Sequence, residues 1–259
     1  MKLVIVPARE GATWVKLGLR TFFRQPLAFT GLFLIFVALI SLLSAIPWIG
    51  NILGLALMPP VTLGFFVASR QAVQGKFPMP SVLFSGFRAG PQQARNMATL
   101  GAMYAGAVML ALAVSALADE GAFARVYLLG GNLDAATLQS PEFQTATLLA
   151  MTVYLPVSMM FWHAPALMQW HNLSATKSLF FSLVACWRNI GAFTVYTMVW
   201  FGVFMAVAML VALIGIVAGS EEAVNIALFP ILLVTAAAFF SSMLFSFEAS
   251  FDAAEVVLA

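Results

Sequence analysis

The stretch LAFTGLFLIFVALISLLSAI, residues 27–46, contains twenty residues and no ionisable side chain. An α-helix rises about 1.5 Å per residue, so about twenty apolar residues cross the roughly 30 Å hydrocarbon core of a bilayer. This stretch therefore predicts a transmembrane helix. Five further stretches of similar composition follow it, and the six predicted spans cover residues 27–46, 49–69, 97–118, 145–169, 190–218 and 224–247.

The composition of the whole chain also indicates a membrane protein. Of its 259 residues, 63% are hydrophobic and only 8% are charged, whereas soluble domains carry about 25% charged residues. The net charge of +2 is too small to predict a nucleic-acid partner. The single cysteine, Cys186, excludes an internal disulfide and a multi-cysteine zinc site. Leu3–Val6 is too short for the core of a signal peptide, so we expect the first span to remain uncleaved.

The basic residues predict the orientation of the chain. All of the 12 Lys and Arg residues except Arg125 fall on the same side of the predicted spans. Because Lys and Arg are enriched in cytoplasmic loops, this side is predicted to be the cytoplasmic one. Six spans then place both termini in the cytoplasm.

A weak internal repeat accompanies the spans. Arg24-Gln25, Arg95-Asn96 and Arg188-Asn189 each precede an odd-numbered predicted span, and PVTLGFF at 60–66 resembles PVSMMFW at 156–162. These matches predict an all-α polytopic fold: one transmembrane domain over 1–259, built from three repeated hairpins at about 8–70, 71–170 and 171–250. The alternative is coincidence, because Arg at a cytoplasmic edge and Pro within a membrane helix are both common.

Each hairpin is predicted to begin with an amphipathic helix in the membrane interface. Residues 9–24 show the pattern best, because their basic side chains fall within about 80° on a helix with about 100° per residue. Trp14 and Phe22 lie on the other side, and Pro26 ends the segment. A cytoplasmic extension of the first span is the alternative. Residues 174–187 repeat the pattern, with Lys177, Ser178 and Ser182 as the polar side.

Seven basic residues at the predicted cytoplasmic surface are candidates for binding anionic lipid head groups of the inner leaflet, which attracts such residues. They are Arg9, Lys16, Arg20, Arg24, Arg88, Arg95 and Arg188.

Sequence motifs for chemistry are absent. The chain has no Gly-rich phosphate loop, no HExxH and no nucleophile elbow, and its carboxylates lie at loops and termini. His163 and His171 lie eight residues apart and have no carboxylate or thiolate nearby in the sequence, which is a poor metal site. The sequence therefore predicts no catalytic residue, no metal and no cofactor.

The segment FWHAPALMQWHNLSATKSLFFSLVACWRNIGAF, residues 161–193, and the opening MKLVIVPARE with FFRQPLAFTGLF carry a family resemblance. They resemble uncharacterised proteobacterial integral membrane proteins with six spans, which are distantly similar to the YciC-like inner-membrane group. The resemblance implies a Gram-negative inner membrane and repeated helical hairpins. It implies no activity and no catalytic residue.

The sequence thus predicts a non-enzymatic inner-membrane scaffold or envelope factor that contacts lipids, another membrane protein or a second copy of itself. The alternative is a transporter or channel subunit for a small or lipophilic solute. Its pathway would lie near Pro60, Pro156, His163 and Pro165, because proline breaks free backbone groups and His163 is the ionisable residue placed well inside a predicted span.

Overall fold

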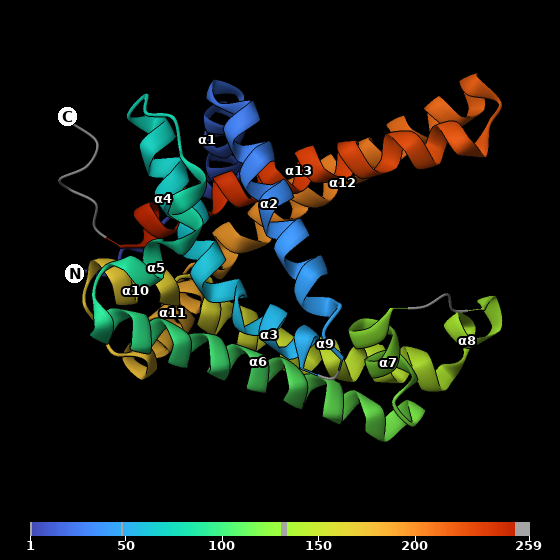
Figure 1. Cartoon of the computed structure of the whole chain (residues 1–259), viewed down its shortest axis with the longest axis horizontal. Coiled ribbons are helices and arrows are strands. Elements are labelled where there is room, and N and C mark those ends of the chain that lie inside the picture. The colour runs from blue at the N-terminus through green and yellow to red at the C-terminus, as the bar shows by residue number, and fades with distance from the viewer. Residues whose placement is uncertain (1, 48, 131–133, 252–259) are drawn as a thin grey trace. The chain divides into compact units, whose positions relative to one another are not determined.

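The computed structural model of the protein describes residues 2–47, 49–130 and 134–251, and it is all-α (Figure 1). In chain order its helices are α1 (Glu10–Arg24), α2 (Pro26–Ser44), α3 (Gly50–Ala56), α4 (Met58–Val73), the 3-10 helix η1 (Pro80–Phe84), α5 (Ser85–Arg88), α6 (Pro91–Asp119), α7 (Ala122–Leu129), α8 (Ala135–Gln139), α9 (Pro141–Trp162), α10 (Ala164–Trp170), α11 (Ala175–Arg188), α12 (Ile190–Ala218) and α13 (Glu221–Ser250).

The membrane spans follow the predicted ones closely. Among the described residues, five helical segments are long and apolar enough to cross a bilayer, and a sixth arises if α3 and α4 form one span bent by 40°. The five are Pro26–Ser44, Pro91–Asp119, Pro141–Trp170, Ile190–Ala218 and Val224–Ser250. The prediction of a multi-span α-helical membrane protein is confirmed, with five to six spans.

The predicted second span differs from a single helix because it breaks at Leu57. Pro59 and Pro60 follow the break and stand in the first turn of α4. Neither residue has a backbone N–H, so the helix loses two successive hydrogen bonds at this point, and proline rings also crowd the preceding turn. The bend between α3 and α4 is the physical result.

The chain divides into two compact units. Within the described residues, the first unit contains everything up to Ala38, then Thr62–Ser85, and the residues from Ala185 onward. The second unit contains Leu39–Val61 and Gly86–Val184.

In the first unit, α1 packs against α12 and α13 (Figure 1). Gly11 and Gly18 make this close approach possible: a Cβ at Gly11 would overlap the backbone of Ala192, and one at Gly18 would overlap Ser242. Small residues are what allow membrane helices to approach so closely. The helix over residues 9–24 is thus confirmed, and its apolar side faces protein.

Aromatic rings fill the space between α2, α4 and α13 in the same unit. The ring of Phe65 lies 4.8 Å from that of Phe240 and 6.2 Å from that of Phe33, measured between centroids. The Ser69 hydroxyl donates to the Ser241 carbonyl at 3.1 Å. This combination of tilted rings and a buried hydroxyl bond fixes α4 against α13.

In the second unit, α6 and α9 form the central helix pair, and α3 packs on α6. The predicted external loop, residues 119–144, contains the short helices α7 and α8. The Asp119 carboxylate begins α7 by accepting the N–H groups of Gly121 at 2.9 Å and Phe123 at 2.6 Å. Ring contact between Phe123 and Phe143, at 5.8 Å, joins α7 to α9.

The three Arg-centred motifs occupy different structural positions. Arg24 and Arg188 each end a helix, α1 and α11, and a single residue separates each from the following span. Arg95-Asn96 instead lies inside α6, because Gly90, with φ of 122°, and Pro91 start that helix earlier. The middle motif therefore does not mark a helix boundary.

Candidate functional site

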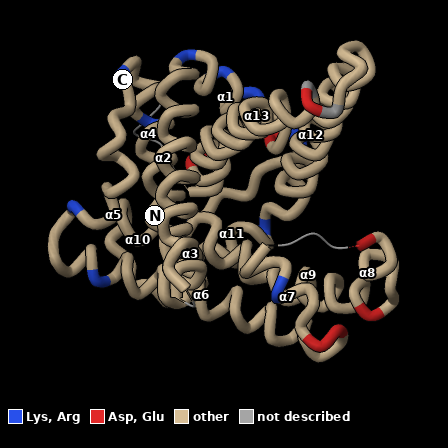
Figure 2. Tube along the Cα trace, turned by 45° about the vertical axis from the view of Figure 1, so that its right-hand side comes forward, with Lys and Arg blue, Asp and Glu red and all other residues tan. Residues whose placement is uncertain are grey.

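The most strongly charged surface of the first unit is the outer side of α1, which we call the α1 basic face. It consists of Arg9, Lys16, Arg20 and Arg24, and all four residues are exposed. Figure 2 shows Lys and Arg positions along α1 in blue. The opposite side of the helix is buried, with Trp14 and Phe22 each at most 2% exposed. The helix therefore presents its basic side outward from a fixed packing surface.

Among the described residues, no carboxylate forms an ion pair with this face. The Arg24 guanidinium donates to the Val73 carbonyl at 3.3 Å, a neutral acceptor. In the described part of the chain, Arg9, Lys16 and Arg20 form no ion pair with a carboxylate. These side chains are consequently available for an anionic partner.

Arg70 differs from the α1 basic face. Its guanidinium, on α4, forms an ion pair with the Glu248 carboxylate of α13 at 3.3 Å, and both side chains are partly buried. This pair joins the ends of two packed helices. It is a structural contact that the sequence did not predict, because 178 residues separate the partners.

The remaining predicted head-group residues lie elsewhere. Arg88 and Arg95 belong to the second unit, and Arg188 ends α11 in the first; all three are exposed. In the second unit, Arg88 and Arg95 lie near the start of α6, whereas acidic residues gather around α7 and α8 at its other end (Figure 2). This segregation matches the polarity expected of a membrane-spanning unit.

Asn189 joins three separate segments of the first unit. Its Oδ1 accepts the Val6 N–H at 2.9 Å, while its Nδ2 donates to the Val4 carbonyl at 3.0 Å and to Ser250 Oγ at 3.2 Å. The side chain is 1% exposed. Asn189 thereby fixes the N-terminal segment to the end of α13, at the point where α11 gives way to α12. The sequence marked this residue only as part of a repeat motif.

The N-terminal segment also pairs directly with the end of α13. Leu3 and Phe251 form an isolated antiparallel bridge, and the Val4 N–H donates to the Ser250 carbonyl at 2.9 Å. The backbone of the N-terminal segment thus finds hydrogen-bond partners both in the end of α13 and in the Asn189 side chain.

His163 occupies a helix break in the second unit. It stands between α9 and α10, is fully buried, and precedes Pro165 by two residues. The Ser182 hydroxyl accepts the His163 N–H at 2.9 Å and donates to the Met159 carbonyl at 2.7 Å. In an unbroken helix these two backbone groups would bond to each other, so the hydroxyl is inserted into the helical ladder.

The two hydrogen bonds of Ser182 place α11 against the break between α9 and α10. Of the predicted polar side of α11, Ser178 and Ser182 are buried and face the protein. Lys177 and Trp187 are exposed instead. Serines fit such an inner face because they are small and can bond to carbonyls at a kink.

The four residues of the predicted pathway take different environments. Pro60 is buried in the first turn of α4, and Pro165 is buried at the start of α10. Pro156 lies inside α9 with its ring exposed. His163 and Pro165 both lie at the break between α9 and α10. Among the described residues, no group of three or more His, Cys, Asp or Glu side chains is placed to hold a metal ion.

Comparison with known proteins supplies the family. Over 258 residues the chain is 38% identical to a probable inner membrane protein of Burkholderia thailandensis, with 98% of this chain and 96% of that protein covered. The chain belongs to this protein family. Family membership and the five to six spans together establish a multi-pass inner-membrane protein. No protein-family model and no solved structure matches it.

Proposed function

We propose that this inner-membrane protein is a non-enzymatic scaffold that gathers anionic lipids at its cytoplasmic surface. The α1 basic face supports the proposal most directly. Four exposed basic side chains stand on one side of a helix whose other side is fixed against α12 and α13. Because the helix is fixed, binding a head group requires ordering of the side chains alone.

The electrostatic gain is large enough to matter. Each Lys or Arg close to an anionic leaflet contributes about 1 kcal/mol of attraction. Arg9, Lys16 and Arg20 have no internal carboxylate partner among the described residues, so this attraction is not reduced by a competing ion pair. Arg88, Arg95 and Arg188 are exposed and would extend the basic surface.

The proposal includes the arrangement of the chain: six spans in three hairpins, with both termini in the cytoplasm. Two features support repetition. α1 and α11 have 15 and 14 residues, each ends in Arg, and each leads after one residue into a span. The resemblance of residues 161–193 to uncharacterised six-span membrane proteins, which are distantly similar to the YciC-like group, supports the same plan. The predicted pathway residues Pro60 and Pro156 differ in burial, so we prefer the scaffold to a transporter.

The orientation can be tested with single cysteines in a Cys186→Ser background. A cysteine replacing Ser220, between α12 and α13, is expected to react with a membrane-impermeant maleimide added to intact cells. A cysteine replacing Lys177, on α11, is expected to react only after the membrane is opened. The reverse labelling pattern would overturn the proposed orientation.

Lipid binding can be tested by changing Lys16, Arg20 and Arg24 together to Gln. Losing three charges at about 1 kcal/mol each predicts at least a tenfold weaker retention of phosphatidylglycerol relative to phosphatidylcholine. Native mass spectrometry of the purified protein with mixed lipids measures this ratio.

The matched control removes the same charge elsewhere, by changing the exposed Lys2, Lys76 and Lys177 to Gln. This variant is expected to retain phosphatidylglycerol as the unmodified protein does. If both triple variants lose lipid equally, the effect comes from net charge, and the proposed role of the α1 basic face is wrong.

A further inference from the structure

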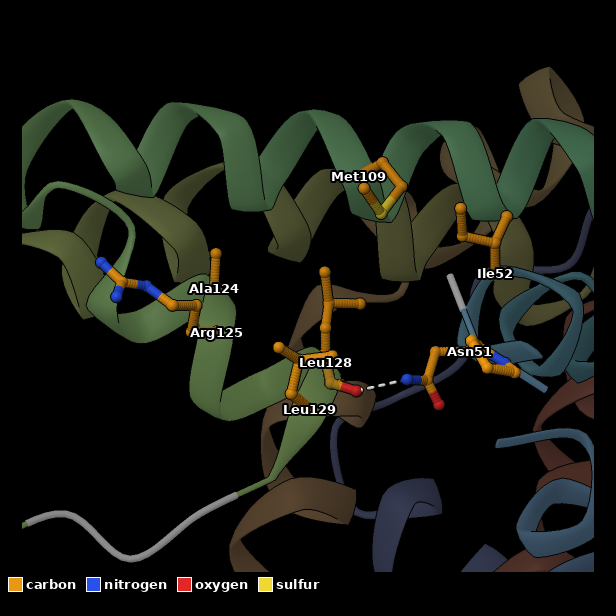
Figure 3. A pocket seen from close by; sticks show the side chains of 8 residues that line it. Asn51, Ile52, Met109, Ala124, Arg125, Leu128 and Leu129 are labelled. Carbon is orange, nitrogen blue, oxygen red and sulfur yellow. Dashed lines mark hydrogen bonds between the residues drawn. The ribbon is translucent and has the colours of Figure 1, made fainter. Parts of the chain in front are cut away.

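A cavity of about 530 Å³ lies within the second unit, between α3, α6 and α7 (Figure 3). Its walls are mostly apolar and include two polar side chains. The lining residues are Pro47, Asn51, Ile52, Met109, Ala124, Arg125, Leu128 and Leu129. Cavities of about 300–1,000 Å³ with apolar walls and few polar groups are typical of small-molecule sites.

The cavity wall formed by α7 is held in place. Asn51 Nδ2, from α3, donates to the Leu128 carbonyl at 2.5 Å in the last turn of α7 (Figure 3). At the other end of α7, the Asp119 carboxylate bonds the N–H groups of Gly121 and Phe123. Because hydrogen bonds hold both ends of α7, the cavity wall that α7 forms is fixed in the second unit.

Arg125 gives the cavity a positive charge at its edge. Its side chain is exposed, and its Nη2 donates to the Glu120 carbonyl at 3.3 Å. In the described residues the guanidinium forms no ion pair. The nearby Asp119 carboxylate already accepts two backbone N–H groups. Arg125 is also the one basic residue on the side of the spans opposite to all the others.

We propose that this cavity binds one hydrocarbon chain of an anionic amphiphile, with the anionic group paired to Arg125. The apolar walls exclude a polar solute of this size, because its groups would find few hydrogen-bond partners. The guanidinium favours a carboxylate or phosphate, which it can bond in two places. A free fatty acid and a lysophospholipid share this chemistry.

The site is separate from the α1 basic face. It uses residues of the second unit only, and the α1 basic face belongs to the first. The proposal therefore goes beyond lipid attraction at the cytoplasmic surface and does not depend on it.

The cavity can be closed by changing Ala124 to Trp. Native mass spectrometry of the purified full-length protein, titrated with oleate or with 1-oleoyl-lysophosphatidylglycerol, is expected to show one saturable bound molecule. Ala124→Trp is expected to weaken this binding at least tenfold, because the indole occupies the chain's volume. Ala136→Trp, at an exposed position on α8, is the matched control and should bind as the unmodified protein does.

The charge can be tested separately with Arg125→Gln and Arg125→Lys. Gln is expected to reduce oleate binding about tenfold while leaving uncharged 1-oleoylglycerol unaffected, and Lys is expected to retain most of the binding. Binding of oleate alone identifies a fatty-acid site, and binding of the lysophospholipid alone identifies a phosphate head group; either supports the proposal.

Two results would overturn it: equal binding by Ala124→Trp and the unmodified protein, or binding of 1-oleoylglycerol as strong as that of whichever anionic amphiphile binds. If the Ala124→Trp variant does not fold, Ala124→Leu, which fills less of the cavity, replaces it in the same binding measurement. The Lys16, Arg20 and Arg24 triple variant should bind oleate normally. A negative result for the cavity is thus distinguishable from a negative result for lipid binding at the α1 basic face.

Discussion

Replacing Gly18 by valine is expected to detach α1 from α13 and to lower stability by about 3 kcal/mol, the upper range for overpacking. A Cβ at this position would overlap the Cα and Cβ of Ser242. Backbone atoms cannot rotate away, so the two helices must separate. Separation also breaks the bond from the Ser241 hydroxyl to the Gly18 carbonyl, which is 3.0 Å long.

Thermal unfolding in detergent, followed by tryptophan fluorescence, measures the effect. Trp14 lies on α1, with its ring 5.2 Å from that of Phe193 and 1% of the residue exposed, so detachment should also shift its emission to longer wavelength. Gly202→Val is the matched control, because a Cβ at Gly202 meets no atom within 4 Å. Equal melting temperatures for the two variants would contradict the tight α1 packing.

Replacing Asn189 by alanine is the second change with a large expected effect. The amide bonds to Val4, Val6 and Ser250, and its loss leaves partly buried backbone groups and the buried Ser250 hydroxyl without this partner. An unsatisfied buried polar group costs about 1–3 kcal/mol, so a total loss of about 3 kcal/mol is expected. Hydrogen exchange at the Val6 amide should accelerate correspondingly, because this N–H bonds to the Asn189 side chain.

The sequence provides a control for this change. Asn96 follows an arginine in the same way, in Arg95-Asn96, but among the described residues its Oδ1 accepts an exposed bond from Gln92 at 3.1 Å. Asn96→Ala is therefore expected to change stability by less than about 0.5 kcal/mol, as exposed substitutions do. A comparable loss in both variants would mean that the Asn189 bonds contribute little.

Periodicity was sufficient to predict the helices that cross the membrane and the amphipathic helix over residues 9–24. Long apolar runs and the angular grouping of Lys16, Arg20 and Arg24 are local properties, and local properties can be read from one segment. The break of the second predicted span at Leu57 was not predicted, because the sequence indicated one continuous span over residues 49–69 and Pro60 only as a candidate pathway residue.

Contacts between distant segments could not be predicted in this way. Nothing in the sequence near Gly18 specifies that Ser242 lies against it. The same holds for Asn51, whose bond to Leu128 shapes the cavity. Arg125 gave the one usable signal, since it was the single basic residue on its side of the predicted spans. The helices α7 and α8 were missed because short helices in polar loops lack a long periodic pattern.

The pairing of the N-terminal segment with the end of α13 has a consequence for biosynthesis. Val4 and Val6 bond to Asn189, and α1 packs mainly against α12 and α13. A ribosome produces these partners after the intervening spans, so α1 lacks its main packing partners while those spans enter the bilayer. Such distant contacts form late and slowly. Completion of α13 is therefore the event that closes the first unit.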